Sequence, residues 1–285
     1  MSAAPVVVTV PDEEYAAALA DLDGVDAVVW DMEGPLERAT DVRLAVMPYM
    51  TRLTVSDISV GLDSLEVVQI QSAGYEGFVD GLPHGVALCN AAGVHDASTA
   101  ELALTLTLAS IREIPEFLAA QRDSHWAPPA MHRALADRRV LVLGYGNIGR
   151  AVVRRFLPFE VSVTAVASRA RTGDDLVDTV HGIDELPELA ARADVLVVNV
   201  ARGPVVDTHD LLAECASGRL RAALDVTDPE PLPEDHGLWS TPGVLITPHV
   251  GGATEAMRPR ALELIRRQVV AMRDGEPPLN VVATG

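Results

Sequence analysis

Residues 134–149, ALADRRVLVLGYGNIG, place an apolar strand directly before a glycine-rich turn and the start of a helix. In this G-x-G-x-x-G pattern Gly144 permits a tight turn, Gly146 lets a pyrophosphate approach bare backbone, and Gly149 lets the helix pack closely on the strand. Val140–Leu143 has the composition of a buried parallel strand, and the residues after the loop are compatible with a helix. This context predicts a dinucleotide-binding loop rather than a glycine turn with a purely structural role.

The composition is that of an α/β protein. With 285 residues the chain can form one large or two modest domains, and 48% hydrophobic with only 4% aromatic residues favours helix-covered parallel sheets. No apolar run reaches the roughly 18–20 residues of a membrane span, and the N-terminus lacks a basic leader, so we expect a soluble, cytoplasmic protein. Cys89 and Cys215 form neither a disulfide framework nor a metal-ligand spacing, and we expect both to be buried.

The charge of the chain excludes several classes of partner and chemistry. A formal net charge of −19 argues against nucleic-acid binding, which needs clustered cations. The sequence contains no lysine, so all 22 Lys and Arg positions are arginine. Schiff-base chemistry and a P-loop lysine are therefore excluded, and anionic groups must be bound by arginine, backbone N–H groups or helix ends. The histidines show no metal-ligand spacing, and no metal site is predicted.

Short apolar strands alternate with helical stretches along most of the chain, which predicts βα units and a mostly parallel sheet. Helices are expected at residues 12–20, 148–157, 184–191, 208–217 and 253–274, with a proline-rich tail after the last. One long, buried helix is expected from Ser98 to Arg122, capped by Asp96 or Ser98. The expected strands are Pro5–Val10, Ala27–Trp30, Leu44–Val46, Val67–Gln71, Val86–Leu88, Val140–Leu143, Val161–Ala167, Asp194–Val200, Ala222–Val226 and Gly243–Thr247.

Three ionisable residues each follow a predicted strand of the second half: Arg202, Glu230 and His249. Open α/β sheets bind ligands at the edge formed by the carboxyl ends of their strands. Histidine can transfer a proton near neutral pH, a carboxylate can orient the imidazole, and an arginine can bind a carboxylate or carbonyl oxygen. Each residue alone has an ordinary structural explanation, but together, downstream of a dinucleotide loop, they indicate an active site.

At this point the chain resembles the D-isomer-specific 2-hydroxyacid dehydrogenases. The matching segments are QSAGYEGF (71–78), ASTAELAL (97–104), LGYGNIGR (143–150), NVARGPVVD (199–207), LDVTDPEPLP (224–233) and TPHVGGAT (247–254). The resemblance implies a Rossmann-type doubly wound domain, residues 96–253, inserted into a flavodoxin-like substrate domain formed by residues 1–95 and 254–285. It also implies a homodimer. The implied reaction is NAD(P)-dependent oxidoreduction at the CH–OH group, which interconverts a small 2-hydroxyacid and a 2-oxoacid such as glyoxylate, hydroxypyruvate or pyruvate.

The resemblance also implies a role for each site residue. His249 is the implied general acid/base, Glu230 is its hydrogen-bond partner, and Arg202 is the residue that binds the 2-oxoacid. Backbone N–H groups of Ala73, Gly74 and Tyr75 would bind the substrate carboxylate. The implied cofactor contacts are Gly144, Gly146, Asn147, Ile148, Gly149, Val200, Ala201, Gly252 and, near the nicotinamide carboxamide, Asp225.

The end of the second Rossmann strand points to NADP. An NAD-binding strand usually ends in an acidic residue about 20 positions past the loop, which accepts from the ribose 2′-hydroxyl. Here the strand ends in Ser168, Arg169 and Arg171, and no carboxylate occurs before Asp174. A serine with arginines suits a 2′-phosphate, so we predict NADP as the cofactor, with NAD as the alternative.

The chain departs from the family pattern after residue 193. In the family, the strand similar to ADVLVV is followed by a loop, a helix and a separate strand that ends in NVARG, whereas here ADVLVV continues directly into NVARG. A strand–helix unit of about 30 residues is missing. If the fused strand takes the first position, Arg202 is displaced by roughly 4.8 Å, and if it takes the second, the sheet has a hole. The alternative function is therefore a dinucleotide-binding scaffold or sensor without turnover.

Overall fold

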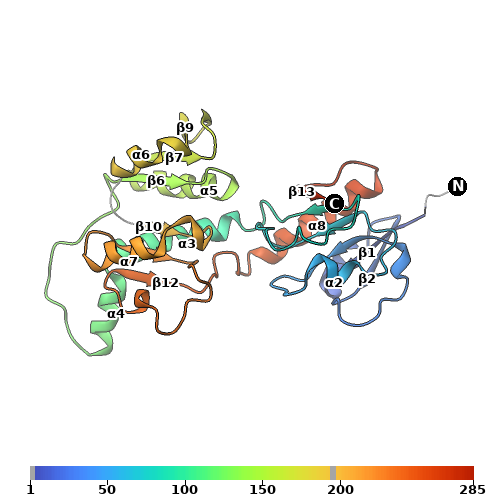
Figure 1. Ribbon diagram of the computed structural model, residues 1–285, viewed down its shortest axis with the longest axis horizontal. Helices are drawn as coiled ribbons and strands as arrows, with labels where there is room; N and C mark the ends of the chain where they lie inside the picture. Colours follow the sequence, from blue (N-terminus) through green and yellow to red (C-terminus); the bar gives the residue numbers. More distant parts are fainter. Residues whose placement is uncertain (1–3, 193–196) are drawn as a thin grey trace. The chain divides into compact units, whose positions relative to one another are not determined.

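A computed structural model describes residues 4–192 and 197–285, and its contacts divide the chain into two compact units (Figure 1). Unit 1 contains Met1–His95 and Glu255–Gly285, and unit 2 contains Asp96–Thr254. The domains predicted from the sequence were 1–95 with 254–285, and 96–253. No helix among the described residues is both long and apolar enough to cross a membrane.

Unit 1 is built on a six-stranded sheet with the order β13-β5-β4-β3-β1-β2. Every neighbouring pair is parallel except β13 and β5, which are antiparallel. The order 2-1-3-4-5 of the parallel strands is that of the flavodoxin-like fold, as predicted. The proline-rich tail, for which no strand was predicted, contains β13. The strands are β1 (Val6–Val10), β2 (Val25–Val29), β3 (Val42–Val46), β4 (Val67–Gln69), β5 (Ala87–Cys89) and β13 (Val281–Thr284).

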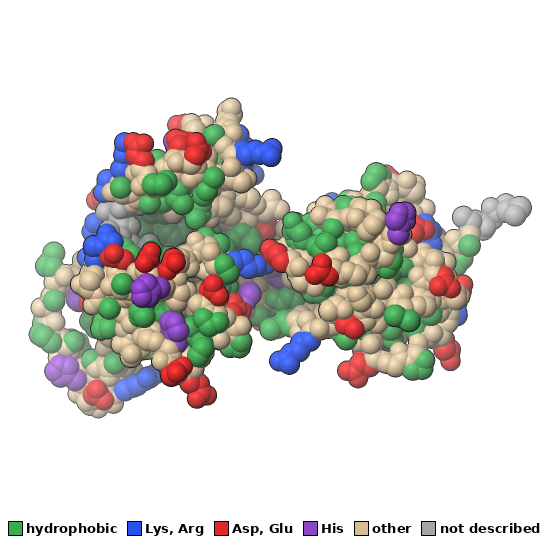
Figure 2. All heavy atoms as spheres, in the orientation of Figure 1, with side chains coloured by type: hydrophobic (Ala, Val, Ile, Leu, Met, Phe, Trp, Pro, Cys, Tyr) green, Lys and Arg blue, Asp and Glu red, His purple; other side chains and the backbone are tan. Residues whose placement is uncertain are grey.

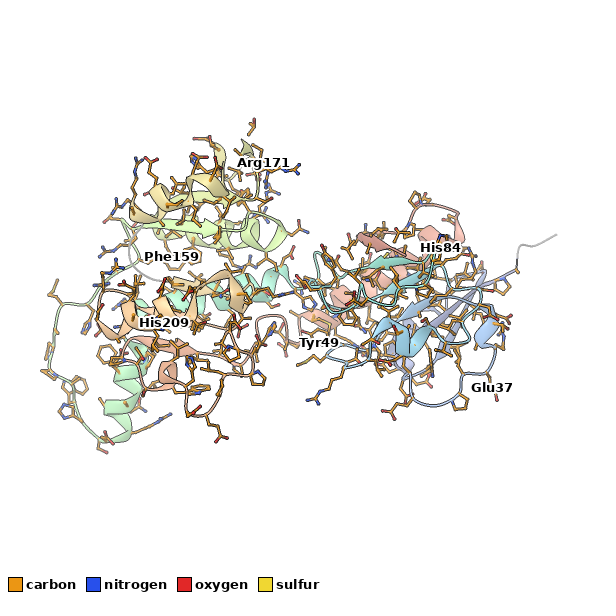
Figure 3. All side chains as sticks on the ribbon, viewed as in Figure 1. Glu37, Tyr49, His84, Phe159, Arg171 and His209 are labelled. Carbon is orange, nitrogen blue, oxygen red and sulfur yellow. The ribbon has the colours of Figure 1, made fainter. Side chains whose placement is uncertain are left out.

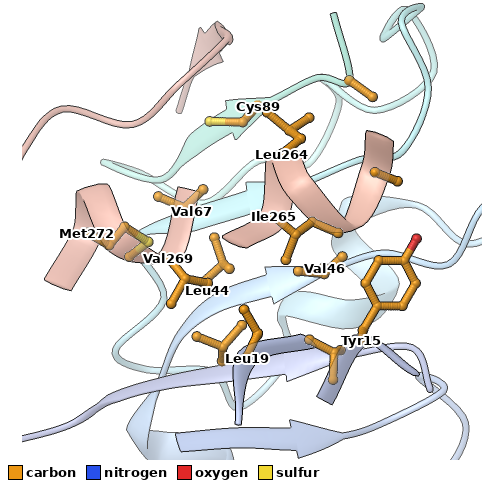
Figure 4. Close-up of a cluster of buried hydrophobic side chains, with 14 of the residues drawn as sticks. Tyr15, Leu19, Leu44, Val46, Val67, Cys89, Leu264, Ile265, Val269 and Met272 are labelled. Atoms are coloured by element: carbon orange, nitrogen blue, oxygen red, sulfur yellow. The ribbon is translucent and has the colours of Figure 1, made fainter. Parts of the chain in front are cut away.

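Helices cover both faces of this sheet. Helix α1 (Glu13–Leu19) begins at Asp12, whose carboxylate accepts from the backbone N–H groups of Glu14 at 3.0 Å and Tyr15 at 3.3 Å. Helices α1 and α8 (Met257–Arg273) bury apolar side chains on one face (Figure 4), and α2 (Val55–Ser59) covers the other. Burying one such Leu or Ile side chain contributes about 1.5–3 kcal/mol to stability, so these faces hold the unit together.

The long helix predicted for residues 98–122 is wrong, because the structure contains two helices there. Helix α3 (Asp96–Ile111) ends before α4 (Ile114–Arg122) begins. The break lies at Glu113, whose φ of 55° is left-handed and cannot continue a right-handed helix. Pro115 lies in the first turn of α4, where a missing backbone N–H costs no hydrogen bond.

Unit 2 contains two separate sheets, with the orders β6-β7-β9-β8 and β10-β11-β12. In the first sheet, β9-β7-β6 corresponds to the Rossmann order 3-2-1. The pair of short strands β8 and β9 was not predicted. The strands are β6 (Arg139–Leu143), β7 (Ser162–Ala167), β8 (Arg171–Thr172), β9 (Thr179–Gly182), β10 (Val197–Asn199), β11 (Ala222–Leu224) and β12 (Val244–Ile246).

The missing strand–helix unit leaves a gap in the Rossmann sheet. Strand β10 pairs with β11, and among the described residues neither pairs with β6, so β10 takes the second of the two positions considered. Residues 194–196 of the predicted strand lie outside the described residues. The expectation that Val140–Leu143 is buried is wrong: in β6 only Val142 is buried and Leu143 is 39% exposed, because β6 now forms a sheet edge.

Helix α3 connects the two sheets through one apolar cluster. Ala100 and Ala103 of α3 pack in a cluster with Val142 of β6, and Val198 and Val200 of the β10 segment are packed against it. Figure 2 shows apolar side chains lining the hollow between these two parts of unit 2. The remaining helices are α5 (Asn147–Phe156), α6 (Leu186–Arg192) and α7 (Thr208–Ala216).

Candidate functional site

The glycine loop between β6 and α5 has one glycine that the protein's own packing does not explain. Gly144 has a φ of +94°, and a Cβ on Gly149 would lie 1.8 Å from the carbonyl oxygen of Gly144, so both positions require glycine. Gly146 has an ordinary φ of −96°, and a Cβ there would meet no atom within 4 Å. The open space beside Gly146, at the N-terminus of the ten-residue helix α5, fits the approach of a pyrophosphate.

Tyr145 fixes the segment that follows β8 against this loop. Its hydroxyl donates to Asp174 at 2.9 Å, and the Arg150 Nε donates to the other oxygen of Asp174 at 2.6 Å. The Leu176 N–H together with Tyr145 and Arg150 holds the pKa of Asp174 below its ordinary value. Both oxygens of this carboxylate are therefore already used by the protein, which leaves Asp174 poorly suited to accept from a ribose hydroxyl.

The residues predicted to select the cofactor lie next to this cluster. Ser168 and Arg169 are exposed after β7, and Arg169 has no hydrogen-bond or ionic partner among the described residues. Arg171, labelled in Figure 3, donates from Nη2 to the backbone carbonyl of Tyr145 at 2.6 Å. Its guanidinium also lies 6.0 Å from the centre of the Tyr145 ring. Arg171 is thus tied to the glycine loop, while Arg169 is available to a ligand.

The three ionisable residues of the second half follow strands that end in register. Asn199, Leu224 and Ile246 are aligned across the parallel strands β10, β11 and β12. Because the carboxyl ends of parallel strands share one edge, the loops of Arg202, Glu230 and His249 all begin at the same edge of this sheet.

His249 and Glu230 form a hydrogen-bonded pair. The His249 Nδ1 lies 2.6 Å from Oε1 of Glu230, and both side chains are about half exposed. His249 has a φ of +53°, and its backbone N–H donates to the Asp225 carbonyl at 2.8 Å. Because a carboxylate only accepts, the contact with Glu230 requires a proton on Nδ1 and leaves Nε2 to face a reactant.

Asp225 holds the loop that carries His249, a role that the sequence did not reveal. Asp225 is 3% exposed, and its carboxylate accepts from the Thr247 Oγ1 at 2.6 Å, the Val250 N–H at 2.9 Å and the Gly251 N–H at 2.8 Å. The only local signal for it is an aspartate that directly follows the buried strand β11. The predicted contact of Asp225 with the nicotinamide carboxamide stays a prediction, as does that of Gly252, which is half-buried.

The loop of Arg202 is shaped by its own side chains and by the neighbouring loop. Asn199 Nδ2 donates to the Arg202 carbonyl at 2.9 Å, and Asn199 Oδ1 accepts from the Ala201 N–H at 3.1 Å. A Cβ on Gly203 would lie 2.0 Å from the Thr227 carbonyl oxygen, so this loop packs tightly on the one leading to Glu230. Arg202 is exposed, and its Nη1 donates to the Ala201 carbonyl at 2.7 Å.

In unit 1 the loop of residues 71–75 follows β4 and presents backbone N–H groups. Among the described residues, the N–H groups of Ala73 and Gly74 donate no hydrogen bond, and that of Tyr75 donates to the Glu76 carboxylate at 3.0 Å. This arrangement can bind an anion through backbone donors. No group of three or more His, Cys, Asp or Glu side chains in the described part of the chain could hold a metal ion.

Comparison with known proteins identifies the family. The profile described as "D-isomer specific 2-hydroxyacid dehydrogenase, NAD binding domain" matches residues 104–199 and 194–251. The human protein named glyoxylate reductase/hydroxypyruvate reductase is 30% identical over 255 residues, which cover 78% of this chain and 74% of the human protein. A glyoxylate reductase of Thermococcus litoralis is 27% identical over 87% of this chain and 85% of its own.

A solved structure with a similar fold carries the same family name. The D-isomer specific 2-hydroxyacid dehydrogenase from Xanthobacter autotrophicus Py2, in complex with NADPH and MES, is 26% identical with a TM-score of 0.81, covering 99% of this chain and 98% of that one.

The comparisons also locate the missing unit. The two profile matches overlap at residues 194–199, so one short segment aligns with two places in the family. The alignment with the human protein spans 255 positions, but 78% of this chain supplies about 30 residues fewer than that. The difference is about the size of a βαβ repeat. The chain belongs to the D-isomer-specific 2-hydroxyacid dehydrogenase family, with unit 2 as its NAD-binding domain, shortened by about one strand–helix unit.

Proposed function

We propose that this protein reduces a small 2-oxoacid, such as glyoxylate, hydroxypyruvate or pyruvate, to the D-2-hydroxyacid with NADPH. The observation that carries the proposal is the pair of His249 Nδ1 and Glu230 Oε1, 2.6 Å apart at the ligand-binding edge of an NAD-binding domain. A family relative named for glyoxylate and hydroxypyruvate reduction supports the substrate class.

Each side chain has a chemical task in this proposal. When bound, the nicotinamide ring supplies the hydride that reduces the keto carbon. His249 donates the Nε2 proton to the keto oxygen, and Glu230 stabilises the charged imidazole before that donation and fixes its orientation. Arg202 binds the substrate through its guanidinium. The N–H groups of Ala73 and Gly74 bind the substrate carboxylate, joined by the Tyr75 N–H once the substrate displaces the Glu76 carboxylate from it.

The cofactor is held by the glycine loop, with Asn147 and Ile148 at the start of α5 beside the pyrophosphate and Val200, Ala201 and Gly252 as further contacts. The preference for NADPH is supported by the exposed Ser168 and Arg169 and by Arg171 beside Tyr145. It is also supported by the engagement of Asp174 with Tyr145 and Arg150. NADH remains the alternative cofactor.

The gap between β6 and β10 favours a second candidate, a dinucleotide-binding protein without turnover. One experiment separates the two functions. NADPH and NADH are each mixed with the purified protein, and both cofactor fluorescence and absorbance at 340 nm are followed with each of the three 2-oxoacids. Oxidation of NADPH supports the reductase. Fluorescence changes without oxidation across the panel support the scaffold and contradict the reductase.

We further propose that the protein is a homodimer that associates through unit 2. Its α4 side chains Ile114, Phe117 and Leu118 are exposed, as are Trp126 and Met131 in the segment that follows. His132 ties that segment to α4, since its Nδ1 lies 3.0 Å from Glu113 and its ring contacts Phe117 edge-on. Such a collection of exposed apolar side chains is typical of a protein interface. Sedimentation of wild type and Phe117→Asp tests this, with a monomer expected only for the variant.

A further inference from the structure

The backbone of the loop formed by residues 71–75 is held in one orientation by bonds to its carbonyl groups. The Ser72 carbonyl accepts from the Ala91 N–H at 2.8 Å, and the Ala73 carbonyl accepts from Asn90 Nδ2 at 2.7 Å. The Gly74 carbonyl accepts from the Ser72 hydroxyl at 2.7 Å. With these carbonyl groups bound on the protein side, the Ala73 and Gly74 N–H groups remain for a ligand.

The fourth carbonyl of this loop, that of Gln71, is bound by His95. The His95 Nε2 lies 2.7 Å from the Gln71 oxygen, and because a carbonyl only accepts, Nε2 carries the proton. His95 is 4% exposed, and its ring stacks on Tyr49 at 5.4 Å between centroids with 22° between planes (Tyr49 is labelled in Figure 3). The imidazole therefore has a single position from which it can reach the loop.

The Gln71 side chain is fixed independently. Its Nε2 donates to the Met47 carbonyl at 2.8 Å, and its Oε1 accepts from the Tyr15 hydroxyl. Burial raises the pKa of Tyr15 to about 12, so the hydroxyl keeps its proton at neutral pH. Residue 71 is thus held at its side chain by Tyr15 and at its backbone by His95, and the second contact fixes the peptide group from which the loop starts.

We propose that His95 is a positioning residue for the substrate: its Nε2–H fixes the Gln71 carbonyl, where the loop begins, and so keeps the next two peptide groups, bound by Ala91 and Asn90, with the Ala73 and Gly74 N–H groups aimed at the carboxylate of the 2-oxoacid. This inference rests on the proposed function. A residue that only filled the core could be replaced by an apolar ring, but here the replacement leaves a buried carbonyl without its donor. The loop would then lose the bond that fixes its first peptide group and keep the other three, so its N–H groups would be less well aligned and the carboxylate would be bound less tightly.

The test compares three variants by steady-state kinetics with glyoxylate and NADPH. His95→Phe keeps a stacking ring but removes the hydrogen-bond donor, and His95→Leu removes both. His95→Gln keeps an N–H donor, because its side-chain amide can reach the Gln71 carbonyl. We expect a KM for glyoxylate raised about tenfold or more in the Phe and Leu variants, with the Kd for NADPH within about twofold of wild type. The Gln variant is expected to recover most of the loss. His84→Phe, an exposed histidine of the same unit, is the matched control and should leave KM unchanged.

A second measurement separates this inference from the proposed function. Oxalate has a carboxylate like that of the substrate but is not reduced. It is titrated into the protein while the backbone amide shifts of Ala73 and Gly74 are followed by NMR. We expect oxalate to shift both amides in wild type, with a Kd raised about tenfold or more in His95→Phe or, if that variant does not fold, in His95→Leu.

If no 2-oxoacid is reduced by wild type, the proposed function fails and the oxalate titration alone decides the inference. Oxalate that does not shift the two amides in wild type, or that binds a folded apolar variant equally well, overturns it.

Discussion

His249 Nδ1 and Glu230 Oε1 lie 2.6 Å apart, although the two residues are 19 positions apart and follow different strands. Replacing the imidazole in His249→Ala should abolish reduction of the 2-oxoacid, because no other group would donate the proton, while the Kd for NADPH stays unchanged. Glu230→Gln should lower kcat by about 10²-fold, because an amide stabilises the charged imidazole poorly. Stopped-flow oxidation of NADPH measures both, and a His249→Ala enzyme with wild-type turnover would remove His249 from the mechanism.

The contrast between Gly146 and Gly149 predicts two different defects. Gly146→Ala should fold normally, because its Cβ meets nothing within 4 Å, but should weaken NADPH binding by about tenfold or more through the lost approach of the pyrophosphate. Gly149→Ala should lower stability by about 1–3 kcal/mol, because its Cβ would lie 1.8 Å from a backbone oxygen. Urea unfolding and fluorescence titration distinguish them. Normal NADPH affinity in Gly146→Ala would mean that the pyrophosphate does not approach this residue.

Arg169 should determine the preference for NADPH. Arg169→Ala removes an exposed guanidinium that has no ionic partner among the described residues, so folding should be unaffected and NADPH should bind about tenfold more weakly. NADH, which lacks the 2′-phosphate, should bind as before. The Kd values come from fluorescence titration of each cofactor. Arg192→Ala, an exposed arginine paired with Glu188 elsewhere in the domain, serves as the control and should alter neither. Equal weakening for both cofactors would contradict a role at the 2′-phosphate.

The unpaired side of β6 should be visible in hydrogen exchange. Backbone N–H groups of Val140–Leu143 that do not bond to β7 should exchange much faster than those of β7, since among the described residues no strand pairs with that side of β6. Inserting the strand–helix segment of the human relative between Val198 and Asn199 should slow their exchange and raise Tm. Slow exchange of the β6 amides in the unmodified chain would show that another part of the protein covers this edge.

Both thiols should be unreactive in the native protein. Burial raises the pKa of Cys89 to about 11, and burial together with Glu214 raises the pKa of Cys215. Because the reactive form is the thiolate, almost none is present at pH 7 in either case. A disulfide reagent should therefore modify no thiol before unfolding and two after it. Rapid modification of one equivalent in the native state would contradict the buried placement.

The parts of the fold that depend on local pattern could be predicted from the sequence. The glycine loop, the parallel strands and the loops of Arg202, Glu230 and His249 follow from apolar runs and from the shared edge of parallel strands. The two buried cysteines were also predicted, and the structure confirms them. The break at Glu113 was missed because the residues on both sides favour helix, although Pro115 is a signal for a new first turn.

Other features depend on contacts between distant segments. The antiparallel strand β13 forms only because β5 offers an edge, and neither Pro277 nor Pro278 before it suggests a strand. Asp225 bonds to a loop 22 to 26 positions away, and His95 bonds to Gln71 at a separation of 24. Hydrophobic periodicity along the sequence does not reveal such pairs. Composition and spacing could therefore place these residues in the core but could not assign their partners.

The gap in the Rossmann sheet has a consequence for how the molecule behaves at high concentration. Among the described residues β6 and β10 each lie at the edge of a sheet, where backbone groups can pair with a strand of another molecule, which is a route to precipitation. The net charge of −19 opposes such encounters by mutual repulsion, and salt shortens its range from about 10 Å at 0.1 M to about 3 Å at 1 M. The acidic composition therefore opposes association through these strand edges, and we expect the protein to stay in solution best at low ionic strength.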